Sequence, residues 1–148
     1  MTQTDLQSKF SQRQFVANMG DTFLFADAKV EDDDKKKFRG TVPKLAKMMA
    51  DTQLKKSTVR GLESIAWSSD SAADVLDYIR IRTGRDVRRK EWASNNIGIE
   101  LAQLLEDLRA EAANHLGNTD DTSAIRELHL ELCREFIKHL VGYFAFDM

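Results

Sequence analysis

The chain contains few of the residues that interrupt helices. It has one proline, seven glycines and one cysteine among its 148 residues. Hydrophobic residues make up 42% of the chain and charged residues 31%, which is enough to build a core and to coat it. This composition favours an all-α protein over a sheet protein rich in tight turns. A chain of this length is typical of one domain.

The scarcity of cysteine excludes two kinds of cross-link. With Cys133 as its single cysteine, the chain can form neither an intramolecular disulfide nor a cysteine-based zinc site. Cys133 lies in a strongly apolar helical stretch, so we expect it to be a small residue of the core.

Several catalytic patterns are also missing. The sequence has no Gly-rich phosphate loop, no Gly-x-Ser-x-Gly elbow and no two Glu-x-x-His pairs of a di-iron bundle. His129 with Cys133, and Glu135 with His139, are each four residues apart on an expected helix. We interpret the first pair as core packing and the second as a surface ion pair. We therefore expect no catalytic residue, no metal and no cofactor, with a metal or redox bundle as an alternative.

Long apolar runs are absent as well. No segment approaches the roughly 18 apolar residues needed to cross a bilayer. Residues 1–20 are polar and lack the apolar run of a signal peptide. We therefore expect a cytoplasmic protein without a membrane partner.

Apolar residues recur at helical spacing along most of the chain, and no stretch alternates as a strand does. The pattern predicts a small bundle of four to five helices around one core. We expect these helices at about residues 41–51, 54–67, 72–90, 97–116 and 123–146. Their expected inward stripes are formed by Leu45, Met48, Met49, Val59, Leu62, Ile65, Val75, Leu76, Ile79, Ile97, Leu101, Leu104, Leu105, Leu108, Ala112, Ile125, Leu128, Leu132, Phe136 and Leu140.

The first forty residues carry a weaker pattern than the helical domain expected at 41–148. Leu6, Phe10 and Phe15 could line one side of a short helix. An acidic run at 31–34 and three lysines follow. Acidic runs can bind cations, but this one lacks the glycine and the final glutamate of a calcium loop. We expect residues 1–40 to form a short helix and a solvated, charged linker.

Aromatic residues gather at the end of the last expected helix, at Tyr143, Phe144 and Phe146. Aromatic side chains bury large areas, so we expect this end to lie in the core or in a subunit interface. An interface there would suit a helical protein–protein adaptor. We keep such an adaptor, which would bind no nucleic acid, as the alternative to a nucleic-acid-binding function.

Charge is unevenly distributed along the chain. The net charge is −2, but residues 53–92 carry nine Lys and Arg against six Asp and Glu, a net +3. Residues 93–148 carry four against ten, a net −6. A local basic face can contact phosphates even when the whole protein is acidic. The alternative interpretation is a solvated surface with uneven charge.

Three stretches, taken in order, resemble one protein family. The first is Leu54–Arg60, a leucine and a short polar stretch that lead into a helix with an early arginine. The second is Leu76–Arg80, followed by Gly84 and Arg85. The third is Leu132–Phe146, an aromatic helix ending in Val-x-Tyr-Phe-x-Phe. Together they are similar to the small subunit of the type III-A (Csm) CRISPR interference complex, over about residues 41–148.

The resemblance implies a helical bundle, present in several copies beside the backbone subunits. In this family, target-RNA cleavage belongs to the backbone subunits and cyclic oligoadenylate synthesis to the large subunit, so the small subunit is not an enzyme. It lines the channel and supports the duplex of guide RNA and target RNA. The expected partners are therefore guide RNA, target RNA, other Csm subunits and further copies of this chain.

A duplex that is selected by base pairing must be held without regard to its sequence, which requires cations on phosphates rather than contacts to bases. Arginine suits this role because its planar fork matches phosphate geometry. Arg60, Arg80 and Arg85 lie in the family-like motifs, and the other candidates rest on charge clustering. We expect the group on one exposed ridge, with Arg82, Arg85 and Arg89 on one side of a single helix. The predicted RNA-binding residues are Lys55, Lys56, Arg60, Arg80, Arg82, Arg85, Arg88 and Arg89.

Overall fold

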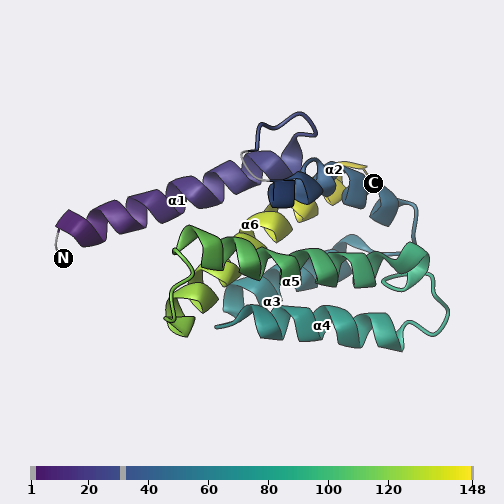
Figure 1. Ribbon diagram of the computed structural model, residues 1–148. Helices are drawn as coiled ribbons and strands as arrows, with labels where there is room; N and C mark the ends of the chain where they lie inside the picture. The colour runs from purple at the N-terminus through teal and green to yellow at the C-terminus, as the bar shows by residue number, and fades with distance from the viewer. Residues whose placement is uncertain (1–2, 31–32, 148) are drawn as a thin grey trace.

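The computed structural model describes residues 3–30 and 33–147, and these form an all-helical bundle (Figure 1). Two 3-10 helices, η1 (Asp33–Phe38) and η2 (Ser94–Asn96), precede α2 and α5. The prediction of an all-α bundle is confirmed, but the expected number of helices was too low, because the described residues contain six α-helices. These are α1 (Gln3–Leu24), α2 (Thr41–Ala50), α3 (Lys56–Ser68), α4 (Ala72–Arg85), α5 (Ile97–His115) and α6 (Thr122–Asp147).

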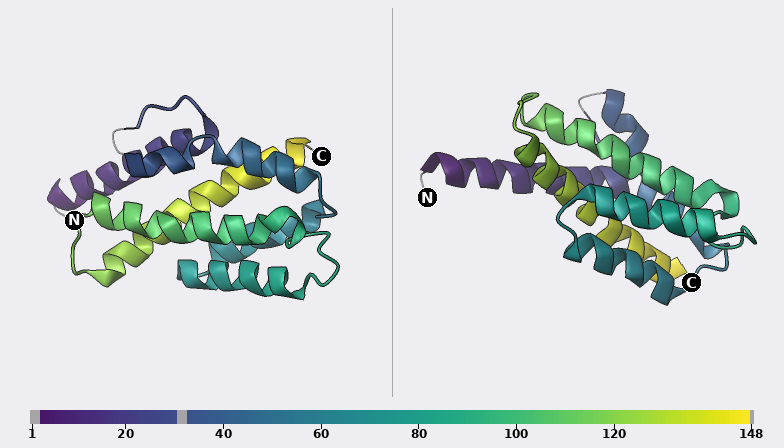
Figure 2. Two further views of the ribbon diagram at one scale, coloured as in Figure 1. Left: turned by 45° about the vertical axis from the view of Figure 1, so that its right-hand side comes forward. Right: turned by 90° about the horizontal axis from the view of Figure 1, so that it is seen from below.

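The additional helix is α1, which has 22 residues and is longer than the short helix we expected. Its C-terminal half is held because Met19 and Phe23 belong to the same buried core as the other helices. Gly20 allows α1 to approach α6 closely, since a Cβ there would lie 2.9 Å from Oε1 of Glu135. The first half of α1 reaches beyond the rest of the bundle, and Phe10 is exposed there (Figures 1 and 2).

The charged run after α1 is only partly a linker. Residues 31 and 32 lie outside the described residues, and η1 begins directly after them. Phe38 ends η1 in the core, where its ring lies edge-on to Phe23 at 6.1 Å between centroids. Gly40 then begins α2 in the left-handed region, at φ 63°, and its N–H donates to the Thr22 carbonyl at 2.9 Å. Gly40 is therefore the N-cap of α2, whose first helical residue, Thr41, is where we expected this helix to begin.

Helix α6 runs through the centre of the bundle and packs against each of the other five α-helices (Figure 2). Leu128, Leu132, Phe136 and Leu140 are buried, which confirms the predicted stripe, and Cys133 is fully buried among them. Although α6 is the longest helix, neither it nor any other helix in the described part of the chain is long and apolar enough to cross a bilayer.

A polar contact between α6 and α3 accompanies this apolar packing. Arg134 donates from Nε to the Ala66 carbonyl at 2.8 Å and from Nη2 to the Ser69 carbonyl at 3.1 Å. Its guanidinium also lies over the ring of Trp67, 5.1 Å from the centroid. The last carbonyls of a helix lack intrahelical partners and carry partial negative charge. Arg134 therefore caps the C-terminus of α3 from a neighbouring helix.

The close approach of α4 and α5 depends on a glycine. A Cβ at Gly98, in the first turn of α5, would overlap the Thr83 hydroxyl of α4. Gly84 in α4 differs, because a Cβ there would meet nothing within 4 Å. The close approach of the two helices is therefore at Gly98 and not at Gly84.

We predict opposite effects of alanine at these two glycines. Gly98→Ala should lower the free energy of unfolding by roughly 1–3 kcal/mol, because overpacking outweighs the better helix propensity. Gly84→Ala should raise it by up to about 1 kcal/mol, since only the propensity changes. Urea unfolding measures both, and Thr83→Ala should partly rescue Gly98→Ala. Equal effects of the two alanines would contradict the packing described here.

His129 is a buried titratable group in the core. Its Nε2 lies 2.8 Å from the Leu105 carbonyl, to which it donates in the neutral form. Burial lowers the pKa of His129, the bond to Leu105 opposes this, and the charge of Arg109 lowers the pKa further. The unfolded chain, in which a histidine has a pKa of about 6.5, therefore binds the proton more readily than the folded chain does.

The folded state should therefore lose stability as the pH falls through about 6.5. We expect His129→Gln, whose amide can still donate to Leu105, to show a smaller loss between pH 7.5 and 5.5. The comparison is the free energy of unfolding in urea at the two pH values. Burial and Lys35 also lower the pKa of His115, so His115→Gln is the matched variant with the same sign. A wild-type protein that gained stability on acidification in this range would contradict the assignment.

Candidate nucleic-acid interface

Helices α3 and α4 form an antiparallel hairpin that brings two basic stretches to one end of the bundle. The two helices touch where Gly61 meets Tyr78, since a Cβ at Gly61 would lie 2.9 Å from the Tyr78 hydroxyl. The loop before α3 and the loop after α4 are also hydrogen-bonded to each other, because the N–H of Gln53 donates to the Lys90 carbonyl at 2.7 Å. The start of α3 therefore lies beside the end of α4 and the loop that follows it (Figure 1).

We call this region the basic end. It comprises residues at the beginning of α3, in the last turn of α4 and in the loop after α4, and every one of these side chains is exposed. Within the described residues, none of them forms an ion pair with a carboxylate. Seven of the eight predicted RNA-binding residues lie here, together with Lys90, which we had not selected. The basic end consists of Lys55, Lys56, Arg60, Arg82, Arg85, Arg88, Arg89 and Lys90.

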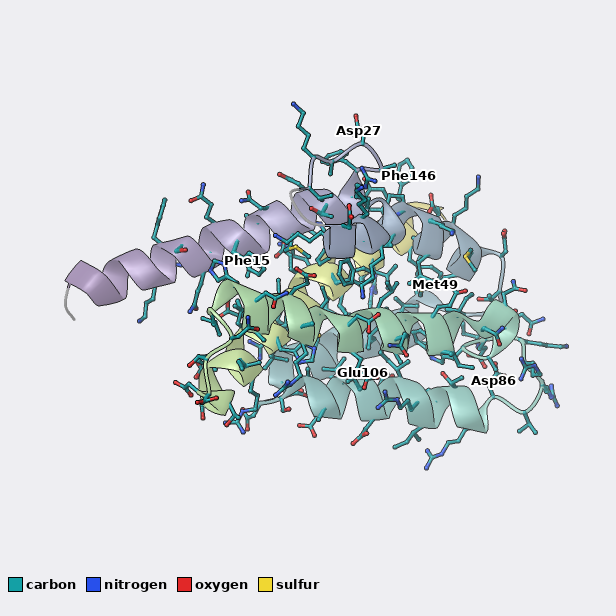
Figure 3. All side chains as sticks on the ribbon, in the orientation of Figure 1. Phe15, Asp27, Met49, Asp86, Glu106 and Phe146 are labelled. Atoms are coloured by element: carbon teal, nitrogen blue, oxygen red, sulfur yellow. The ribbon has the colours of Figure 1, made fainter. Side chains whose placement is uncertain are left out.

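Arg80 is the predicted residue that lies apart from this group. Its Nη2 lies 2.8 Å from Oε2 of Glu106 on α5, in a salt bridge between two half-exposed side chains. Arg80 and Arg82 are two residues apart, which turns their side chains about 200° from each other around α4. Arg82 instead lies over the ring of Tyr78, 5.2 Å from the centroid. The structure therefore separates Arg80 from the other candidates, and Figure 3 marks Glu106 well away from Asp86 at the basic end.

The expected single helical side for Arg82, Arg85 and Arg89 was wrong. Helix α4 ends at Arg85 rather than near residue 90, so Arg89 lies in the following loop, at φ 55°. The cause is Asp86, whose side chain accepts backbone N–H groups from the loop. A short acidic side chain that binds nearby backbone in this way competes with helix formation. The basic residues are therefore spread over two helix ends and a loop rather than along one ridge.

Asp86 makes an unusual number of contacts for a surface carboxylate. Its Oδ2 accepts the N–H groups of Glu91 and Ala93 at 2.8 and 2.9 Å, and its Oδ1 accepts that of Lys90 at 3.3 Å. Burial raises the pKa of the Asp86 carboxyl, but its backbone hydrogen bonds together outweigh this, so the net shift is downward. The carboxylate stays ionised and fixes the loop that carries Arg88 and Arg89.

The residue pairs considered for catalysis have other contacts. His129 and Cys133 both point at the Leu105 carbonyl, with the Cys133 Sγ at 3.7 Å from it. Burial raises the pKa of the Cys133 thiol, which keeps it protonated. Oε1 of Glu135 lies 2.8 Å from Nε2 of His139, and its Oε2 lies 3.0 Å from Nζ of Lys138. Across residues 3–30 and 33–147, no three His, Cys, Asp or Glu side chains are grouped in a way that could hold a metal ion.

The aromatic end of α6 is divided between the core and the surface. Phe144 is buried, and Tyr143 is half-buried. Phe146 is 87% exposed, and a shallow pocket beside it is lined by residues of the last turns of α6. The expectation that this end lies in the core holds for Phe144 and not for Phe146.

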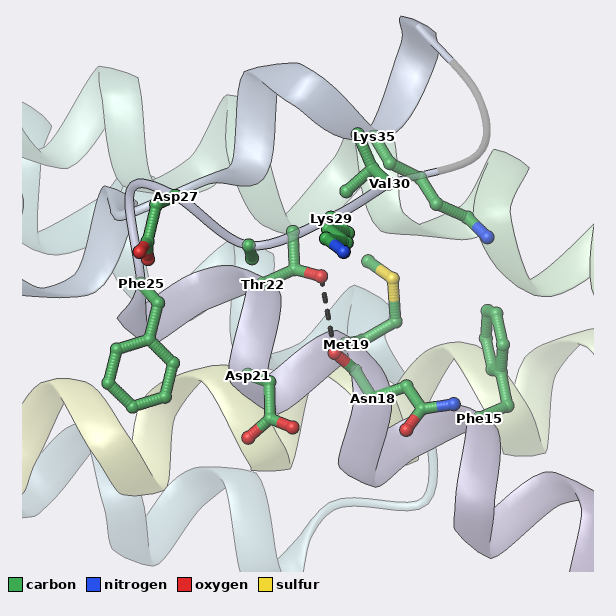
Figure 4. A pocket seen from close by; sticks show the side chains of 11 residues that line it. Phe15, Asn18, Met19, Asp21, Thr22, Phe25, Asp27, Lys29, Val30 and Lys35 are labelled. Carbon is green, nitrogen blue, oxygen red and sulfur yellow. Dashed lines mark hydrogen bonds between the residues drawn. The ribbon is translucent and has the colours of Figure 1, made fainter.

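A second pocket lies between the C-terminal half of α1 and residues 25–30 (Figure 4). The Thr22 hydroxyl beside it donates to the Asn18 carbonyl at 3.2 Å. The lining mixes apolar, acidic and basic side chains. Asp27, which lines this pocket, and Asp86 at the basic end are widely separated in Figure 3, so the pocket is not part of the candidate interface.

No known protein family matches this chain, and no curated protein or solved structure shows significant similarity to it.

Proposed function

We propose that the chain is the non-catalytic small subunit of a type III-A CRISPR effector complex, acting in the cytoplasm. In this proposal it binds and supports the duplex of guide RNA and target RNA without reading the sequence, for antiviral defence. Its partners would be the two RNA strands, the backbone and large Csm subunits, and further copies of itself. The proposal combines the resemblance of three sequence stretches with the chemistry of the basic end.

The observation that carries the proposal is the group of cations without carboxylate partners. The cations of the basic end are exposed on two helix ends and one loop, and none of them is neutralised by an ion pair among the described residues. When exposed cations pair with phosphates, they displace the counterions that are condensed on the RNA. This release produces an affinity that is independent of sequence and sensitive to salt. A protein that holds a base-paired duplex needs this kind of contact.

The test is a comparison of two fourfold alanine variants of equal charge. Changing Arg82, Arg85, Arg88 and Arg89 to alanine should weaken binding to mixed-sequence RNA duplex at least tenfold near 0.1 M salt. The slope of log K against log salt should also become shallower, by up to about 0.9 for each phosphate contact that is lost. Fluorescence anisotropy titrations at several salt concentrations measure both quantities.

The control variant changes four exposed cations elsewhere, Lys9, Lys29, Arg109 and Arg126, to alanine. It lowers the net charge by the same amount, so net charge alone predicts the same loss. The proposal expects the control to keep most of the affinity and of the salt slope. The basic end would be excluded as the RNA contact if both variants lost the same affinity. It would also be excluded if the variant at residues 82, 85, 88 and 89 bound RNA as tightly as wild type.

Arg80 gives a finer prediction, because Glu106 already neutralises it. Arg80→Ala should change the RNA affinity less than twofold, whereas Arg82→Ala should lower it several-fold. Glu106→Gln frees the Arg80 guanidinium on the α4–α5 side, away from the basic end, so it should also change the RNA affinity less than twofold. The same anisotropy titrations apply. A loss on Arg80→Ala as large as that on Arg82→Ala would place RNA on the α4–α5 side of the bundle instead.

Phe146 favours a second candidate function, a helical protein–protein adaptor. An aromatic side chain that is 87% exposed beside a shallow pocket can anchor a protein partner. An adaptor would show no binding to mixed-sequence RNA, or a trace that does not respond to salt. The titrations described above therefore separate the two functions, although a subunit of a complex can carry both surfaces.

A further inference from the structure

The loop after α4 is fixed at several points although it lies on the surface. Asp86 binds three of its N–H groups, and the Lys90 carbonyl accepts the N–H of Gln53. Trp92 is buried in the core, and its carbonyl accepts the N–H of Gly98 at 2.7 Å. The three consecutive cations at 88–90 therefore stand on a loop that is bonded before any ligand arrives.

Arg89 occupies a backbone conformation that its residue type disfavours. Its φ is 55°, in the left-handed region, where a Cβ crowds the following carbonyl. In the described part of the chain, every other residue with positive φ is a glycine or an asparagine, the two types that tolerate this region best. The Arg89 side chain is exposed and makes no ion pair among the described residues, so the fold does not require an arginine there. An arginine in a disfavoured conformation that the fold does not need is better explained by a ligand that its side chain would contact.

Asp86 places a negative charge among the cations of the basic end, which is unexpected for a site that binds an anion. A negative charge among cations opposes the binding of an anion, so electrostatics alone would favour a neutral residue. The Asp86 oxygens are instead directed at backbone N–H groups of the loop. Its contribution to an anion site is therefore structural, and it must outweigh the repulsion.

We propose that Asp86 is a positioning residue, which holds Arg88, Arg89 and Lys90 as a preformed loop that contacts consecutive phosphates of the RNA backbone. This inference rests on the proposed function, because it names the part of the basic end that the RNA would meet. A preformed loop avoids the loss of conformational freedom that a mobile loop would undergo on binding. Arg89 remains an arginine at a strained position because its guanidinium reaches a phosphate.

Asp86→Asn and Asp86→Ala separate positioning from charge. Both remove the same negative charge, so electrostatics alone predicts that both bind RNA more tightly and to the same extent. The asparagine keeps a side-chain oxygen that accepts N–H groups, and the alanine does not. We expect Asp86→Asn to bind at least as tightly as wild type, and Asp86→Ala to bind at least fivefold more weakly than Asp86→Asn with a shallower salt slope. Equal affinities in the two variants would overturn the inference.

A second readout needs no RNA. Trypsin cleaves after Arg88, Arg89 and Lys90 only where the chain can open, so a fixed loop resists it. Asp86→Ala should be cut there faster than wild type or Asp86→Asn, whereas Ser71→Ala, which removes the side-chain cap at the other end of α4, should not. Equal cleavage rates in all four proteins would show that Asp86 does not hold the loop.

Arg89 completes the test. Arg89→Gly relieves the backbone and removes the cation, so it should raise the midpoint of urea unfolding while weakening RNA binding. Arg89→Lys keeps a cation and should retain most of the affinity. RNA binding that is unaffected by Arg89→Gly would remove this residue from the contact. If wild-type protein binds no RNA, the proposed function fails and this inference with it, whereas binding that ignores Asp86 overturns the inference alone.

Discussion

The bundle depends on the burial of one helix by all the others. Helix α6 packs against five neighbours, and its inward residues fill the space between them. A helix that is covered on most sides leaves little room for polar groups, which are expensive to bury without partners. The polar side chains that α6 does contribute have hydrogen-bond partners. Arg134 donates to carbonyls at the C-terminus of α3, and His129 contacts the Leu105 carbonyl of α5. These contacts fix how α3 and α5 sit on α6.

The position of the basic end follows from this arrangement. Arg134 sets the C-terminal end of α3, and the α3–α4 hairpin then directs the start of α3 and the end of α4 to the opposite end of the pair. Gly98 lets α5 approach α4 closely, which brings Glu106 within 2.8 Å of Arg80. The same packing therefore neutralises one arginine of α4 and leaves the others exposed. The uneven charge along the sequence becomes an uneven charge in space because neighbouring stretches fold as neighbouring helices.

The sequence predicted those features that depend on local spacing. The stripe of Leu128, Leu132 and Phe136 gave the buried side of α6, and the end expected at residue 116 lies one residue beyond His115, where α5 ends. Helix α1 was underestimated because most of its residues are polar and its apolar side is weak. Its place in the fold comes from the few apolar residues near its C-terminal end.

The candidate site was predicted less completely, for physical reasons. The clustering of basic residues in residues 53–92 was visible in the sequence, and the hairpin brings most of them together. The pairing of Arg80 with Glu106 was not visible, because the two residues are 26 positions apart and meet only through the packing of α4 on α5. The role of Asp86 was also hidden, since its partners depend on the backbone path of the loop. The run of cations suggested a longer helix, and one carboxylate ended it.

The uneven docking of α1 has a consequence for how this helix melts. Its C-terminal half is nucleated by the contacts of Met19 and Phe23 with the core, and helix propagation from an existing turn is far easier than starting a new one. The projecting half, where Phe10 lies exposed, is therefore an extension that grows from the docked turns and frays back towards them. Amide protection along α1 should fall in a gradient from residue 23 towards its first turn, so the length of the helix is set by temperature and surroundings as well as by sequence.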